Sequence, residues 1–285
     1  MRKLPSTVTP TRIARRALIA QLDKTVEQLR KPRRSDASIH NIRKALKRAR
    51  AALRMLRECM GIMEYRHDNA LLRDAARPLT PIRDAKVVLQ TLAQLGQKKA
   101  GRRGFLARFQ KLLEAKRRLA HRQLRPSELT AAARALRGIR RRAAALPESR
   151  LANPHARGLE HAFEKARAAF AVARQQGTDE SLHEWRKQTK YFANQLEMVL
   201  PSGSRLFEKS YTHAKQLADC LGEDHDLAIL TEQIYAHANG EDAPGTSREV
   251  RALIGGAARR RKKLQRRALH LGARLYSGRA ARYRP

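Results

Sequence analysis

Two groups of four basic residues share one internal spacing in this chain. The first group is His40, Arg43, Lys44 and Lys47, and the second, 143 residues later, is His183, Arg186, Lys187 and Lys190. Because an α-helix turns by about 100° per residue, offsets of three, four and seven place the side chains of each group within one sector of roughly 100°. Guanidinium groups grip two phosphate oxygens at once and ammonium groups supply mobile point charges. The spacing therefore predicts two equivalent cationic surfaces for a polyanion.

Each group is expected to lie on a long amphipathic helix. In the first helix the cationic stripe continues through Arg50 and Arg54, while apolar residues gather on the opposite side. In the second helix Trp185 has the phase of the apolar face, which favours core packing over a base-stacking role. Each helix is predicted to bury one face and to offer the other to an anion.

The similarity between the two parts of the chain extends beyond the basic groups. The stretch from Leu72 to Arg77, followed by Arg83-Asp84, is echoed by Ala214 to Asp219, followed by His225-Asp226. The pairs Thr9-Pro10 and Asn153-Pro154 have the form of helix starts, with a capping residue before proline. These offsets indicate an internal duplication, with one half over residues 1–146 and the other over residues 147–285.

Composition restricts the class of partner. The 285 residues include 62 Lys and Arg against 26 Asp and Glu, a formal net charge of +36, and this self-repulsion favours a polyanionic partner. Cys59 and Cys220 do not occupy matching places in the repeat, which is typical of free thiols in a reducing compartment. The N-terminus lacks an apolar secretion signal and no segment is long and apolar enough to span a membrane. The sequence therefore predicts a cytoplasmic protein with no membrane partner.

Periodicity and chain breakers together predict an all-α fold, because Ala and Leu dominate the apolar residues and only 5% of the chain is aromatic. Each half is expected to be an antiparallel bundle of about four main helices, and a pseudo-twofold axis would relate the two bundles. Gly177, Pro201, Gly203 and Gly222 are expected breaks. The helices are predicted near residues 10–30, 35–61, 66–79, 82–96, 103–123, 127–144, 154–175, 178–200, 204–221, 223–239 and 247–276.

These motifs resemble the CHAD family, the conserved-histidine α-helical domain. The resemblance rests on His-x-x-Arg-Lys-x-x-Lys on a long helix, followed by Leu-x-x-x-Arg-Asp before another helix, and it covers nearly the whole chain. It implies two four-helix bundles with a basic groove or pore between them, binding of inorganic polyphosphate, and association with polyphosphate granules.

The resemblance also implies a set of polyphosphate-binding residues, to which the stripe adds Arg50 and Arg54. The matching positions are His40, Arg43, Lys44, Lys47, Arg73, Arg77, Arg83, His183, Arg186, Lys187, Lys190, Lys215 and His225. Asp219 stands at the position of Arg77, and Asn194 and Glu197 replace the continuing stripe, so the second half is expected to bind polyphosphate less strongly or mainly to complete the scaffold.

Two other functions are weighed against this one. Binding of nucleic acid without sequence specificity is the main alternative, since any polyanion responds to the net charge. Exposed aromatic residues for base stacking and a recognised base-reading module are both missing from the pattern. Hydrolysis of triphosphate or polyphosphate would need a cluster of metal-binding carboxylates, whereas Asp74, Asp84 and Asp226 are scattered beside arginines as helix-capping or ion-pairing groups. We therefore expect no enzyme activity, no metal and no cofactor, and the oligomeric state stays open.

Overall fold

The computed structural model describes residues 9–31, 35–96, 104–152, 157–202, 204–238 and 248–283, and these residues form helices and connecting turns without a strand. Short 3-10 turns follow several of the helices. The α-helices are α1 (Pro10–Arg30), α2 (Asp36–Met55), α3 (Ile62–Ala76), α4 (Thr80–Gly96), α5 (Phe105–Gln123), α6 (Pro126–Ala144), α7 (Glu148–Leu151), α8 (Gly158–Gln176), α9 (Asp179–Val199), α10 (Arg205–Ala238) and α11 (Arg248–Tyr276). The prediction of an all-α fold is confirmed.

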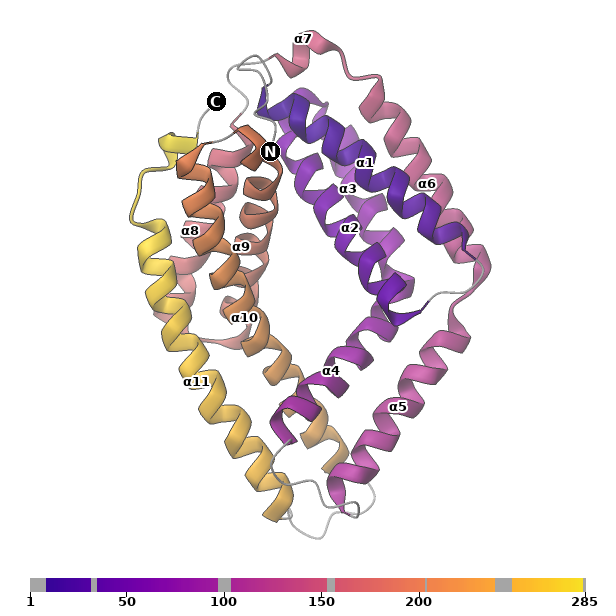
Figure 1. Ribbon diagram of the computed structural model, residues 1–285, viewed down its shortest axis with the longest axis vertical. Helices are drawn as coiled ribbons and strands as arrows, with labels where there is room; N and C mark the ends of the chain where they lie inside the picture. The colour runs from indigo at the N-terminus through magenta and orange to yellow at the C-terminus, as the bar shows by residue number, and fades with distance from the viewer. Residues whose placement is uncertain are drawn as a thin grey trace.

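The helices form two groups that meet along α2 and α9 and again at the far end of the molecule (Figure 1). In one group α2 packs against α1 and α3, and α6 packs against both of these; in the other, α9 packs between α8 and α10, and α11 covers α10. The helices α4 and α5 extend away from the first group and contact the long helices α10 and α11 of the second. The chain thus encloses a central region bounded by α2, α4, α9 and α10.

Apolar faces at helical spacing hold this arrangement together. On α2 the buried face includes Ile39, Ile42, Leu46 and Leu53, all at most 1% exposed. Trp185 on α9 is fully buried and stacks at a tilt against Phe170, with ring centroids 5.0 Å apart, which confirms its predicted place in the core. The main core runs through both groups, and a second, smaller core lies between α4, α5, α10 and α11.

The starts of α2 and α9 are capped in the same way. Ser35 accepts a hydrogen bond from the backbone N–H of Ser38, and Thr178 accepts one from Ser181, each at 3.2 Å. The two caps are 143 residues apart, the same offset as the two basic groups. Each cap is also followed at once by an aspartate, where a negative charge favours the helix N-terminus. The repeat therefore includes the signals that fix where each basic helix begins.

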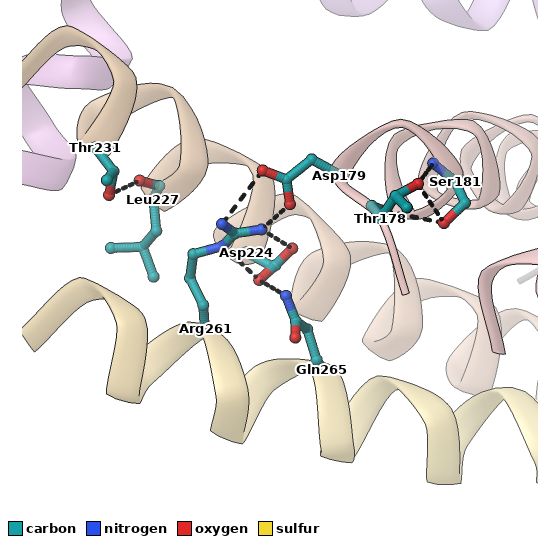
Figure 2. A network of polar contacts seen from close by, with 8 residues as sticks. All are labelled: Thr178, Asp179, Ser181, Asp224, Leu227, Thr231, Arg261 and Gln265. Atoms are coloured by element: carbon teal, nitrogen blue, oxygen red, sulfur yellow. Dashed lines mark hydrogen bonds and ion pairs between the residues drawn. The ribbon is translucent and has the colours of Figure 1, made fainter. Parts of the chain in front are cut away.

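Both of these aspartates are held by cations from other helices. Asp36 accepts bonds from Arg117 and His121 of α5, each at 2.8 Å, and these lower its pKa in spite of the opposing effect of burial. Asp179 is bound by Arg261 of α11, which also donates to the buried Asp224 of α10 at 3.1 Å (Figure 2). Contacts from outside each basic helix thus anchor its first turn.

The network around Arg261 links three helices. Gln265, one turn further along α11, donates to Asp224 at 3.0 Å, so the α10 carboxylate is shared by two side chains of α11 (Figure 2). Burial raises the pKa of Asp224, and the Arg261 guanidinium opposes that rise. Although Arg261 lies in a run of basic residues, it is a structural ion-pair partner with 19% of its side chain exposed.

The predicted helix break at Gly222 is wrong, because α10 is continuous from Arg205 to Ala238. A single glycine costs a helix only about 1 kcal/mol relative to alanine, which tertiary packing readily overcomes. The corresponding place in the first half carries Pro78 and Pro81, and there the chain changes to a 3-10 turn between α3 and α4. A Cβ atom on Gly222 would lie 3.6 Å from Lys190 Nζ, which is an ordinary contact distance, so the Lys190 side chain of α9 lies against α10 at this residue.

The helix predicted over residues 35–61 ends earlier, at Met55, and a 3-10 turn (Arg57–Cys59) follows it. The other helix predictions agree with the structure to within four residues at each end. The predicted helix start at Asn153-Pro154 and the expected break at Gly203 fall outside the described residues.

Candidate anion-binding site

The two basic helices contact each other directly. Arg48 of α2 forms an ion pair with Glu197 of α9, and the Arg54 guanidinium lies over the ring of Tyr191, 3.9 Å from its centroid. With an offset of 143 residues, Arg48 corresponds to Tyr191 and Arg54 to Glu197, so these two contacts are reciprocal. Between them, Gln195 Nε2 donates to the Ala51 carbonyl at 3.2 Å. Equivalent surfaces of α2 and α9 therefore face each other.

This contact places most of the predicted residues around one hollow region, which we call the central cavity. It consists of three adjoining pockets of about 390, 520 and 580 Å³, all of which have Asp226 in their walls. The first two pockets also share Arg43, Lys47, Arg83 and Arg186. Of the predicted binding residues, the central cavity is lined by His40, Arg43, Lys44, Lys47, Arg83, His183, Arg186, Lys190, Lys215 and His225.

Three arginines of the cavity carry buried N–H groups without a hydrogen-bond partner among the described residues. These groups are Nε of Arg43, one terminal NH2 nitrogen (Nη1) of Arg83 and Nε of Arg186. Arg43 is oriented through its other nitrogen, Nη1, which donates to the Ala76 carbonyl at 3.2 Å and to the Thr80 hydroxyl. A buried donor without a partner costs free energy that a bound oxyanion would recover. Donors from both halves of the chain are therefore positioned for an anion.

Two lysines of the cavity, Lys47 and Lys190, are destabilised as cations in the free protein. Burial, followed by the nearby charges of Arg186 and Lys47, lowers the pKa of Lys190 to about 7. Lys47 has a pKa lowered to about 8 by desolvation and then by Arg43 and Arg186, although its side chain is exposed to solvent within the concave wall. Lys47 is more exposed than Lys190, so solvent screens the repulsion at Lys47 more strongly.

The histidines of the cavity are also held toward the neutral form. The rings of His183 and His225 lie 4.6 Å apart, and burial followed by Arg186 lowers the pKa of His225 to about 4. The pKa values of His40 and His183 are lowered too, first by burial and then by Arg83 and Arg186 respectively. A bound polyanion would oppose all of these shifts, because an opposite charge favours protonation.

Carboxylates share the cavity with these cations. Asp84 and Asp226 lie close enough to Arg43 and Arg186 to raise the pKa values of the two guanidinium groups, although burial lowers them overall. Burial raises the pKa of Asp226 itself. Asp219, which stands where the first half has Arg77, lies in two of the three pockets. The cavity is therefore basic but not uniformly so, and the acidic groups are concentrated on α10.

The other predicted residues lie away from these walls. Lys187 pairs with Glu184 on its own helix, and Arg73 pairs with the neighbouring Asp74 at 3.4 Å. Arg77 is exposed. These three residues are not among those that line the central cavity.

Arg50 and Arg54 also turn away from the cavity, although they continue the cationic stripe. Arg50 donates to the Asn69 side chain at 3.2 Å, and both guanidinium groups lie over the ring of Tyr191. Neither residue is among those that line the central cavity.

The sequence did not identify several residues that line the cavity. Arg48, Asn194 and Tyr211 border the pocket of about 390 Å³, and Arg260 borders the pocket of about 580 Å³ while paired with Glu223. Arg48 corresponds to Tyr191 in the repeat, so the pattern of recurring basic residues carried no signal for it. Arg260 lies in a run of basic residues, where only tertiary contacts distinguish one member from the next.

The described part of the chain contains no group of three or more His, Cys, Asp or Glu residues arranged to hold a metal ion. None of the helices among the described residues is both long and apolar enough to cross a membrane. Cys59 and Cys220 are both buried free thiols, and burial raises the pKa of each.

Comparison with known proteins agrees with this architecture. The model of the CHAD domain family matches residues 14–235, and the chain therefore belongs to the CHAD domain family. Among solved structures, PptA from Streptomyces chartreusis is similar with a TM-score of 0.69 and 17% identity, over 93% of this chain and 99% of that one. The crystal structure of the CHAD domain from the plant Ricinus communis is similar with a TM-score of 0.60 and 16% identity, over 98% of this chain and 97% of that one. No curated protein matches the sequence.

Proposed function

We propose that this protein binds inorganic polyphosphate in the central cavity, as a binding protein without catalytic activity. The main support for this proposal is that buried N–H groups of Arg43, Arg83 and Arg186 have no hydrogen-bond partner among the described residues. They come from α2, α4 and α9, so a ligand that bonds all of them must be polyanionic and must fit between both halves. The depressed pKa of Lys190 adds a cation whose repulsion a bound phosphate chain would relieve.

A flexible polymer of identical phosphates suits this wall better than a nucleic acid does. The cavity offers basic groups at many positions, and Tyr211 in its wall stands beside Glu197 rather than as an open stacking surface. Proteins that bind single strands combine a basic groove with exposed aromatic platforms. Hydrolysis is disfavoured because the nearby carboxylates of Asp84 and Asp226 lie among arginines and are not clustered for a metal.

The proposal includes the organisation of the chain. We infer that residues 1–146 and 147–285 are two halves of one CHAD domain related by a pseudo-twofold axis, as the reciprocal contacts Arg48–Glu197 and Arg54–Tyr191 suggest. The second half adds less positive charge to the cavity because Asp219 and Glu197 stand in its wall. A cytoplasmic place, at polyphosphate granules, is the cellular expectation that follows from this ligand.

Competition binding tests the proposal. Long-chain polyphosphate should displace single-stranded DNA of matched charge from the protein, while DNA should displace polyphosphate poorly, with EDTA present throughout. Arg43→Gln with Arg186→Gln should weaken polyphosphate binding at least about tenfold, because hydrogen bonds to charged groups contribute ~1.5–3 kcal/mol each. The matched control, Arg118→Gln with Arg134→Gln, removes two exposed arginines of α5 and α6. Equal losses from the two variants, or stronger retention of DNA than of polyphosphate, would refute the proposal.

A further inference from the structure

A second cationic pocket lies where α2, α3, α8 and α9 meet, and it shares no lining residue with the central cavity. Its volume is about 220 Å³. Its walls include Arg54 of α2, Arg57 of the 3-10 turn that follows α2, Arg66 of α3, Lys165 of α8 and Tyr191 of α9. Its α9 wall, formed by Gln188, Tyr191 and Gln195, is turned by at least about 60° of helix rotation from the α9 residues that line the central cavity. We call this the α8 pocket.

The residues that line the α8 pocket include four arginine or lysine side chains and no carboxylate. The positive charges are close enough to affect each other: burial, then Arg54 and Arg57, lower the pKa of Lys165. His161 lies 3.3 Å from an Arg57 nitrogen, and its pKa is lowered by burial and then by Lys165 and Arg57. The neighbouring Glu58, Glu164 and Glu184 act in the opposite direction but more weakly, and they do not line the pocket.

Two buried polar atoms of this pocket's lining residues have no partner among the described residues. One is Nε of Arg54, whose guanidinium is held over the Tyr191 ring. The other is Oε1 of Gln195, a side chain with 1% exposure that is fixed because its amide nitrogen donates to the Ala51 carbonyl. A donor and an acceptor without partners, beside four cations, point to a bound group with both oxyanions and a hydroxyl.

We propose that the α8 pocket is a separate binding site for a compact phosphate group of the size of pyrophosphate. Pockets for drug-sized ligands run from about 300 Å³ upward, so a smaller and strongly cationic pocket fits a small anion. The phosphate oxygens accept from Arg54, Arg57, Arg66 and Lys165, and a protonated oxygen donates to Gln195. This site does not depend on the central cavity, so either proposal can fail without the other.

The test uses Lys165 as a reporter in the full-length protein. Its side chain is exposed, and its lowered pKa increases the fraction of free amine that can react with an acetylating reagent at a given pH. Pyrophosphate at ten times its Kd should slow acetylation of Lys165 by about tenfold, since only the unoccupied site reacts. Lys116, an exposed lysine of α5, serves as the internal standard at matched ionic strength, and mass spectrometry gives both rates.

Two variants test whether the protection of Lys165 depends on the α8 pocket. Arg57→Gln with Arg66→Gln changes two exposed side chains of the α8 pocket and should abolish the protection of Lys165 by pyrophosphate. Arg118→Gln with Arg134→Gln removes the same charge elsewhere and should leave the protection intact. Thermal unfolding checks that both variants are folded. The proposal would be overturned if pyrophosphate slowed the acetylation of Lys165 no more than that of Lys116. Equal protection of Lys165 in both variants would also overturn it.

A final experiment distinguishes binding of free pyrophosphate at the α8 pocket from binding of the end of a longer polyphosphate chain. In Lys47→Gln with Lys190→Gln, pyrophosphate should protect Lys165 as well as it does in the unaltered protein, because neither lysine lines the α8 pocket. If only long-chain polyphosphate protects Lys165, and the protection disappears in this variant, the phosphate at Lys165 is the end of a polymer held in the central cavity. That result would overturn a separate site.

Discussion

Lys190 lies across the interface of α2 and α9 from Lys47, its counterpart in the repeat, and the two ammonium groups repel each other in one pocket wall. Lys47 lowers the pKa of Lys190 only in the folded chain, since 143 residues separate them in the sequence. The fold therefore holds like charges together at a cost that a bound polyanion removes.

Charge reversal in the first basic group should weaken polyphosphate binding far more than the same reversal elsewhere. Arg43→Glu, Lys44→Glu and Lys47→Glu together should lower affinity by about 100-fold or more, because each lost charged hydrogen bond contributes ~1.5–3 kcal/mol. The control, Lys111→Glu, Lys116→Glu and Arg118→Glu, reverses three exposed charges of α5. Fluorescence anisotropy at fixed salt measures both, and comparable losses would mean that only the overall charge matters.

Affinity for long-chain polyphosphate should fall as the pH rises above 7. The pKa of Lys190 is about 7 in the free protein, and a bound polyanion raises it. The contribution of the Lys190 charge to binding affinity is therefore complete below pH 7. It is lost as the pH rises through the higher pKa that Lys190 has in the complex.

Calorimetry in two buffers of different ionisation enthalpy should show proton uptake on binding near pH 8. Lys190→Arg keeps the charge and should reduce both the uptake and the pH dependence, whereas Lys116→Arg should change neither. Binding without proton uptake in the unaltered protein would contradict the assignment to Lys190.

The histidines should contribute to polyphosphate affinity at lower pH than Lys190 does. The pKa values of His40 and His183 lie below the ordinary value of 6.5 in the free protein, so their charged form is gained only when pH falls through that lowered value or when the anion binds. His40→Gln with His183→Gln should lower affinity several-fold near pH 5 and leave it unchanged near pH 8. His213→Gln with His270→Gln, outside the central cavity, is the control. A parallel loss at both pH values would identify the two imidazoles as neutral hydrogen-bonding groups.

Gly222→Ala should stabilise the protein. Gly222 is helical, and the added Cβ would make an ordinary contact of 3.6 Å with Lys190 Nζ, so the gain in helix propensity of up to about 1 kcal/mol is kept. A rise in Tm of about 2 °C is expected for a chain of this size.

Gly177→Ala is the matched comparison for this substitution. Gly177 ends α8 with a φ of +62°, a left-handed conformation that disfavours a side chain, so Tm should fall. Circular dichroism on heating measures both variants, and a fall in Tm for Gly222→Ala would indicate that α10 is interrupted after all.

The sequence by itself determined the helices and the directions of their faces. Apolar residues at helical spacing on α2 and the cap at Ser35 are local signals, and the structure agrees with the helix that they predict. The recurrence of His40 through Lys47 at His183 through Lys190 likewise indicated two equivalent basic faces, because phase around a helix depends only on residue number.

Only the tertiary structure decided which basic residues share a cavity. Arg43 and Arg54 lie on the same stripe of α2, yet Arg43 faces the central cavity while Arg54 is held over Tyr191 at the α8 pocket. The different surroundings of these two arginines come from the helices that pack against α2 near each of them, and from the carboxylates of α10. Charge repulsion and burial act through space, so the lowered pKa of Lys190 depends on neighbours that the local sequence does not contain.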